Sequence, residues 1–206
     1  MRRLVLAIIL ALTGAIPATA AEESPYGTGL TFVAYRNGEA IGRHTLAFQQ
    51  YGPELQVSTS IDLAVKFLGL TVYRYTHQAQ EIWRNGALQS LISQTNDNGE
   101  KFAVRTPGRD IGGKPTSPDL LPSTHWNHRQ VHQSRLLNSQ TGAEARVQIV
   151  PVGRETIRTS RGSIDATRYR YTGDIVMDQW FDDRGRWVKM SFAASDGSMI
   201  EYILQE

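Results

Sequence analysis

A pattern of strand, tight turn, strand, tight turn and strand runs from Glu81 to Thr106, and it constrains the fold more than any other stretch. Asn85-Gly86 and Asn98-Gly99 stand where the chain must reverse. Asn-Gly is the dipeptide that best tolerates the positive φ angles of a type I′ turn. We therefore predict a three-stranded antiparallel meander here.

A related pattern returns between Asp178 and Leu204. Three pairs of residues correspond, at offsets of 97, 99 and 98 positions: Trp83 and Trp180, Gly86 and Gly185, Gly99 and Gly197. The same meander is therefore expected twice in the chain.

The N-terminus has the charged, apolar and small-residue order of a secretory signal peptide. Arg2 and Arg3 precede an apolar run that is too short to span a bilayer, and Ala18-Thr19-Ala20 follows it. We expect a signal peptide over residues 1–20, localisation in the periplasm or outside the cell, and a protein that does not span the membrane.

The remaining chain is formally neutral. Without Arg2 and Arg3, the 22 Lys and Arg become 20, which equals the number of Asp and Glu. Nucleic-acid binding requires a surplus of positive charge to neutralise the phosphates, so no nucleic-acid partner is expected. Residues 21–29 are polar and contain Gly and Pro, which predicts a flexible N-terminal arm. The length of the remaining chain predicts a single domain over residues 30–206.

No cysteine is present, which excludes thiolate chemistry and acylation on cysteine. Nucleotide-binding glycine motifs and the Gly-x-Ser-x-Gly elbow are also absent from the sequence, so no cofactor is expected.

Further strands are expected on both sides of the first meander. Leu55–Val65 alternates apolar and polar residues, and Thr71–Trp83 is a long strand candidate. Lys66–Leu70 is interpreted as a bend or bulge between them. About 11–12 strands joined by short turns must form an antiparallel sheet, which curls into a barrel, half-barrel or sandwich. The predicted fold class is all-β, a curled antiparallel sheet (barrel or half-barrel).

The middle of the chain differs in composition. Pro107–Pro122 holds four of the eight prolines and is predicted to be a long loop, either mobile or covering something. Ser123 is a plausible N-cap, and Thr124–Asn138 has neither Pro nor Gly, so one short helix is expected there.

Aromatic residues supply the candidate ligand site. Tyr73, Tyr75 and Trp83 share one face of a predicted strand, and Trp126 lies on the predicted helix. If these side chains line a concave interior, they suit a lipid or another small apolar ligand. The alternative for these aromatic faces is ordinary core packing plus an outer aromatic girdle. A separate interpretation of the predicted helix has Trp126 anchoring it in the mouth of the barrel.

A weaker candidate is a metal site formed by His125, His128 and His132, which would share one helical face. The HExxH arrangement is absent, and Arg129 between them disfavours a cation. Asp182-Asp183, with Asp178 nearby, is interpreted as part of a turn rather than as a catalytic pair of carboxylates.

Three stretches resemble a family of uncharacterised bacterial periplasmic proteins, a domain of unknown function: Glu81–Thr106, Leu121–Asn127 and Gly153–Leu204. The resemblance implies a signal-bearing, β-rich periplasmic protein and brings no catalytic residues.

These observations favour a periplasmic, non-enzymatic binding or carrier module for an apolar or amphipathic ligand, with a lipid-like small molecule as its partner. The alternative is a structural or interaction protein of the cell envelope whose barrel is filled by side chains. A hydrolase or a metal-binding protein is the third hypothesis. The sequence does not give the oligomeric state.

Overall fold

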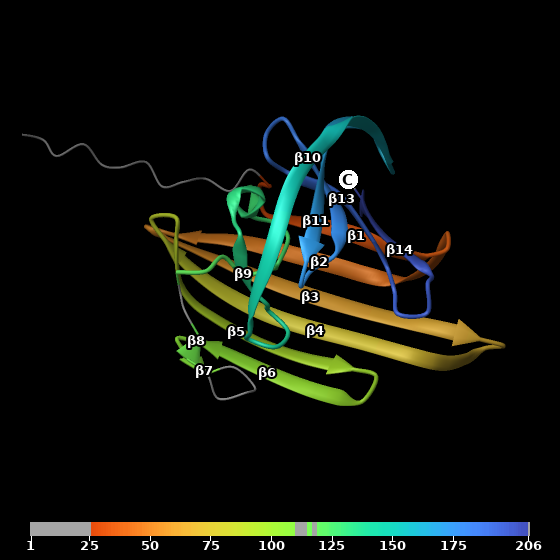
Figure 1. The fold of residues 1–206 in the computed structure, drawn as a ribbon, viewed down its shortest axis with the longest axis horizontal. Coiled ribbons are helices and arrows are strands. Elements are labelled where there is room, and N and C mark those ends of the chain that lie inside the picture. The colour runs from red at the N-terminus through yellow and green to blue at the C-terminus, as the bar shows by residue number, and fades with distance from the viewer. Residues whose placement is uncertain (1–25, 110–114, 117–118, 206) are drawn as a thin grey trace, which may run out of the picture.

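The computed structural model describes residues 26–109, 115–116 and 119–205. Twelve strands form one sheet in the order β6-β5-β4-β3-β2-β1-β14-β13-β12-β11-β10-β9 (Figure 1). They are β1 Gly29–Arg36, β2 Glu39–Tyr51, β3 Glu54–Phe67, β4 Leu70–Arg84, β5 Ala87–Asp97, β6 Glu100–Thr106, β9 Arg135–Leu137, β10 Glu144–Thr159, β11 Gly162–Gly173, β12 Met177–Asp182, β13 Trp187–Ala193 and β14 Met199–Gln205. A separate small sheet pairs β7 (Gly108–Arg109) with β8 (Pro115–Thr116).

Both predicted meanders are present, as β4-β5-β6 and β12-β13-β14. The Asn-Gly pairs adopt the left-handed backbone that they predict, with φ of 52° and 72° at Asn85-Gly86 and of 49° and 102° at Asn98-Gly99. Consecutive strands pair antiparallel, and β1 pairs with β14. The prediction of an all-β, curled antiparallel sheet with 11–12 strands is confirmed.

The sheet curls without closing, because β6 and β9 are its two edges and do not pair with each other (Figure 1). The segment after β9 bridges the gap. The Ser93 hydroxyl on β5 donates to the Ser139 carbonyl oxygen at 2.5 Å, and the Tyr75 hydroxyl on β4 donates to Gln140 Oε1 at 3.1 Å. The result is a half-barrel whose concave side holds the core.

The predicted helix over Thr124–Asn138 is wrong in extent. Only η1, a 3-10 helix at His128–His132, forms there, and β9 begins at Arg135. Asn127 rather than Ser123 caps it, because the Asn127 side chain accepts a hydrogen bond from the Arg129 backbone N–H. The stretch lacks a strong apolar stripe, so pairing of Arg135–Leu137 with β10 overrides its helical tendency.

The β3–β4 connection combines a tight turn with an irregularity in the strand pairing. Leu68-Gly69 forms the hairpin turn, and the pairing of β3 with β4 shifts register between Val65 and Lys66, where the predicted stretch Lys66–Leu70 begins. Within the predicted arm, Tyr26 is buried and β1 begins at Gly29. The predicted signal peptide, residues 21–25 and much of the Pro-rich loop lie outside the described residues. Within the described part of the chain, no helix is long and apolar enough to cross a bilayer.

Gly42 permits a close approach of β2 and β3. It lies beside a β-bulge with φ of 153°, and a Cβ there would lie 2.0 Å from the Asp62 carbonyl oxygen. We expect Gly42→Ala to lower the free energy of unfolding by about 3 kcal/mol or more, because strain and a backbone clash add. Urea denaturation measures this change.

Gly153→Ala is the matched control. Gly153 also lies at a bulge and has a φ of 157°, but a Cβ on this residue would have no atom within 4 Å. A loss as large as that of Gly42→Ala would show that strain alone, without the Asp62 contact, accounts for the effect.

Candidate functional site on the concave face

The inward-facing side chains of β4 form the central part of the candidate site. The period of two predicted for this strand places six side chains on the concave side: Tyr73, Tyr75, His77, Ala79, Glu81 and Trp83. The face runs from half-buried tyrosines near the β3–β4 turn to fully buried residues near Asn85. The strand therefore spans the interior from an open end to a covered end.

Trp83 and Trp126 meet at the covered end. Their ring centroids are 5.4 Å apart at an interplanar angle of 84°. Trp126 also contacts Phe48 and Tyr26, at centroid distances of 5.5 and 6.4 Å. The structure therefore brings these two predicted ligand residues together as a buried plug that closes this end.

Glu81 is fully buried between these two indoles. Trp83 Nε1 donates to Glu81 Oε2 at 2.8 Å, and Trp126 Nε1 lies 3.2 Å from both carboxyl oxygens. Burial raises the pKa of Glu81 to about 7, although the hydrogen-bonding side chains of Thr124, Trp83 and Trp126 lower it in part. The Thr124 hydroxyl faces the carboxyl without forming a well-aligned hydrogen bond. Glu81 is thus a carboxyl that can exchange a proton near neutral pH.

Three histidines gather in the interior. His44 on β2 lies 6.4 Å from His125, between ring centroids, and both pack against Trp187, at 5.2 and 5.3 Å. His77 on β4 lies with its Nδ1 2.8 Å from the Thr95 hydroxyl. Burial lowers the pKa of His77 and of His125 to about 4 and lowers that of His44 well below its usual range. Nearby histidine charge lowers the pKa of His44 and of His125 further, so these rings are neutral at pH 7.

Two buried amides hold His125 in an unusual conformation. Its φ is 72°, which is uncommon for a residue with a side chain. Gln130 and Gln179 both donate from Nε2 to the His125 carbonyl oxygen, at 2.9 and 2.8 Å. Such local strain persists where the surroundings over-determine it, and it is concentrated at functional sites. The clamp directs the imidazole of His125 into the interior.

Several polar atoms on this face are buried without a hydrogen-bond partner among the described residues. They are both ring nitrogens of His44, Nδ1 of His125, Oε1 of Gln130 and of Gln179, and the hydroxyls of Thr59 and Tyr171. Buried polar groups are normally paired, so a cluster of unpaired ones requires an explanation. The unpaired amide oxygens can accept hydrogen bonds, and the unpaired ring nitrogens and hydroxyls can donate or accept them. A polar group of a ligand placed among these atoms could therefore form hydrogen bonds.

The tyrosines line the open end. The Tyr73 hydroxyl donates to Asp97 Oδ1 at 2.6 Å, and the Tyr75 ring stacks with His77 at 6.5 Å. Burial raises the pKa of Tyr202 on β14, and the phenols of Tyr75 and Tyr73 raise it further. Phe192 stacks on Tyr202 at 6.3 Å. This aromatic collar, made of Tyr73, Tyr75, Phe192 and Tyr202, is half-buried except for Tyr202, which is buried.

His125, His128 and His132 do not share one face, because η1 begins only at His128. His125 points into the interior, whereas His128 packs on Phe181 at 4.8 Å. Among the described residues, no group of three or more His, Cys, Asp or Glu is arranged to hold a metal ion.

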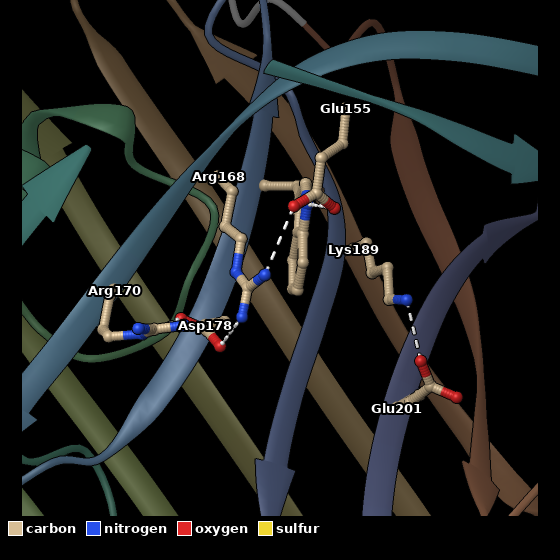
Figure 2. Close-up of polar contacts among 7 residues, drawn as sticks. Glu155, Arg168, Arg170, Asp178, Lys189 and Glu201 are labelled. Atoms are coloured by element: carbon tan, nitrogen blue, oxygen red, sulfur yellow. Dashed lines mark hydrogen bonds and ion pairs between the residues drawn. The ribbon is translucent and has the colours of Figure 1, made fainter. Parts of the chain in front are cut away.

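The convex face carries a different cluster, whose charged groups pair mainly with one another (Figure 2), although Arg168 Nε is buried without a hydrogen-bond partner among the described residues. Arg168 pairs with Glu155 and Asp178, at 3.2 and 2.5 Å, and Arg170 also pairs with Asp178. Trp180 lies between Arg168 and Lys189, whose charged groups are 5.2 and 5.0 Å from its ring. Trp180 therefore lies on the convex side of the sheet, although it is as buried as Trp83, which lies on the concave side. The two corresponding tryptophans thus occupy opposite faces in the two meanders.

The sequence interpretation missed His44, Gln130 and Gln179. His44 had a usable signal, because it precedes Leu46 and Phe48 on one face of an alternating strand, where a lone histidine is conspicuous. The two glutamines carried no such signal, since their role depends on where the His125 carbonyl lies.

The fold and site define a β-rich protein built on an incompletely closed half-barrel with a polar, aromatic concave interior. The chain belongs to the family described as a domain of unknown function (DUF6134), whose model matches residues 32–205. The resemblance to a family of unknown function is therefore confirmed.

A solved structure shares the fold. A crystal structure of a β-barrel-like protein of the domain of unknown function DUF1849, from Brucella abortus, aligns with a TM-score of 0.50 and 7% identity. The alignment covers 85% of this chain and 94% of the other. No curated protein matches the chain.

Proposed function

We propose that the protein is a non-enzymatic binding or carrier module of the periplasm or cell exterior, and that its concave face takes an amphipathic, lipid-like ligand. One observation carries this proposal: the cluster of buried, unpaired polar atoms around His44 and His125 lies beneath an aromatic collar. A ligand with an apolar body would pack against the aromatic collar, and its polar group would form hydrogen bonds with the unpaired atoms at the histidines.

The arrangement gives each part of the ligand a partner. Tyr73, Tyr75 and Phe192 offer apolar ring faces at the open end. A neutral His44 can donate from one ring nitrogen and accept at the other, which suits a hydroxyl or an uncharged carboxylic acid. Trp83 and Trp126 close the far end and limit how deeply a ligand enters.

Native mass spectrometry of the protein exported from the full-length gene product tests the proposal. We expect bound mass that is released on denaturation and is identified as a lipid-like molecule. A dansyl-labelled fatty acid serves as a defined probe. We expect it to bind about tenfold more weakly to Tyr75→Ala and to His44→Leu, since each change removes one side-chain contact.

Tyr35→Ala is the matched control. Tyr35 is a half-buried tyrosine on β1 that alternation places on the convex face, beside Glu201. Its substitution should leave probe binding unchanged. If the wild-type protein carries no adduct and binds no probe, the proposal is wrong.

A second candidate is a structural or interaction protein with a filled interior. Continuous ring packing favours it: Phe32 stacks on Trp187 at 3.9 Å, and His44 and Tyr202 complete the layer. An adduct-free mass from several preparations supports this second function.

A further inference from the structure

The β3–β4 hairpin extends beyond its neighbours in the sheet (Figure 1). The pairing of β3 with β2 ends at Leu63, and the pairing of β4 with β5 begins at Tyr75. Between these limits, the two strands pair only with each other. We call this projecting ribbon, residues 64–73, the finger.

The tip of the finger is apolar and solvent-exposed. Four of its side chains have large exposed fractions: Phe67 67%, Leu68 87%, Leu70 72% and Val72 54%. Phe67 and Leu70 lie directly opposite each other across the ribbon. A two-stranded ribbon has no layer on which to bury such a cluster, and concentrated exposed apolar surface marks an interaction site.

The turn itself differs in composition from three other hairpin turns of the sheet. Asn-Gly occupies the turns at residues 37–38, 85–86 and 98–99, with the Asn φ between 49° and 52°. Leu68-Gly69 adopts the same geometry with φ of 49° and 80°, so a leucine stands where the other turns have asparagine. The left-handed conformation is costly for leucine, and a residue that breaks a local rule in this way points to a function for its side chain.

The surroundings of the finger fit a lipid surface. A pocket of about 270 Å³ at its base is lined by Arg36, Glu39 and Lys66, among others. Ala64, at this base, is four strand positions from Leu68, or roughly 13 Å. Insertion of the tip by about 5–10 Å would place Lys66 at the level of the lipid phosphates, whereas Arg36 is already ion-paired with Asp196. A tip of three side chains, Phe67, Leu68 and Leu70, is small beside the roughly 800 Å² per partner of a stable protein interface.

We infer that the finger inserts its apolar tip, Phe67, Leu68 and Leu70, into a lipid surface. Leu63, Val65 and Phe67 lie on the same face of β3, and Tyr73 lies opposite Val65. The apolar surface thus runs from the tip to the aromatic collar. This gives a lipid-like ligand a path between the membrane and the concave face, a consequence that rests on the proposed function.

Flotation with vesicles tests the inference without any bound ligand, so its failure is distinguishable from failure of the carrier proposal. The chain exported from the full-length gene product is mixed with phosphatidylcholine vesicles, with and without phosphatidylglycerol. We expect the wild type to float with the vesicles. Leu68→Asn and the double variant Phe67→Ser, Leu70→Ser should each bind the vesicles about tenfold more weakly. Val176→Ser, which removes an equally exposed apolar side chain elsewhere, should float like the wild type.

Leu68→Asn introduces the residue that three other hairpin turns of the sheet use, so it should raise the melting temperature by roughly 2–4 °C. Loss of flotation by a more stable variant cannot be ascribed to unfolding. Because the chain has no cysteine, Leu68→Cys and Val176→Cys can each carry one environment-sensitive dye. Only the dye at position 68 should report an apolar environment on vesicles.

Three results would overturn the inference. The first is wild-type protein that floats with neither vesicle composition. The second is Leu68→Asn that floats like the wild type while Lys66→Gln does not, because this pattern means adsorption by charge alone. The third is a change of oligomeric state in Leu68→Asn without wild-type vesicle binding, because the tip would then pack on a second copy.

Discussion

Acidification from pH 7 to pH 4 is expected to lower the free energy of unfolding by several kcal/mol, because buried histidines resist protonation. The pKa values of His77 and His125 are lowered to about 4, whereas these residues titrate near 6.5 in the unfolded chain. Between these values the unfolded state binds protons that the folded state does not, so stability falls as the pH falls. Each residue contributes roughly 3 kcal/mol, and His44 acts in the same direction.

Glu81 opposes this trend in part. Its pKa is raised to about 7, so its contribution to stability is full below about pH 4.5 and is lost as the pH rises through 7. The gain on acidification is roughly 3 kcal/mol, which is less than the loss from the histidines together. The net loss is a large part of an ordinary stability of about 5–15 kcal/mol.

Urea denaturation at a series of pH values measures how steeply the free energy of unfolding changes with pH. His125→Asn should flatten this dependence between pH 6.5 and 4, since asparagine tolerates the positive φ and does not titrate. His132→Asn is the control, because His132 is exposed on η1. If His125→Asn shows the same dependence on pH as His132→Asn and the wild type, protonation of His125 does not contribute to acid unfolding.

Trp126→Ala is expected to lower the free energy of unfolding by about 3–5 kcal/mol. The substitution empties the space against Trp83, Phe48 and Tyr26 and removes an N–H donor that faces both oxygens of buried Glu81. Denaturation at pH 8, where Glu81 is mostly ionised, should show the full loss, because a buried charge then lacks a donor.

Trp126→Phe separates the two contributions. Phenylalanine retains most of the ring packing and removes only the N–H, so about 1–2 kcal/mol should be lost. The loss should be smaller at pH 5, where Glu81 is mostly protonated. A loss below 1 kcal/mol for Trp126→Ala would contradict the role of Trp126 as the plug of the covered end.

Local sequence signals predicted most of the architecture. The Asn-Gly turns and the alternation in Leu55–Val65 depend on neighbouring residues and on the strand period, so they survive in any packing. These signals were enough to predict a curled antiparallel sheet with about the right number of strands. They failed over Thr124–Asn138, where pairing with β10 decided the outcome.

The candidate site was only partly predictable. The inward face of β4 follows from its alternation, so Tyr73, Tyr75 and Trp83 were correctly grouped on one side of the sheet. Which histidines meet was not predictable, because His44, His77 and His125 come from distant segments that the curl of the sheet brings together. The spacing of His125, His128 and His132 was misleading, since it assumed a helix that does not form.

The sequence by itself determined the strands, the turns and the alternation of faces, because these depend on backbone geometry over a few residues. Only the tertiary structure decided that Trp126 plugs one end, that Glu81 is buried between two indoles and that the finger projects from the other end. Those features depend on how far the twisted sheet curls and on which strands extend beyond their neighbours, and contacts between residues far apart in the chain set both.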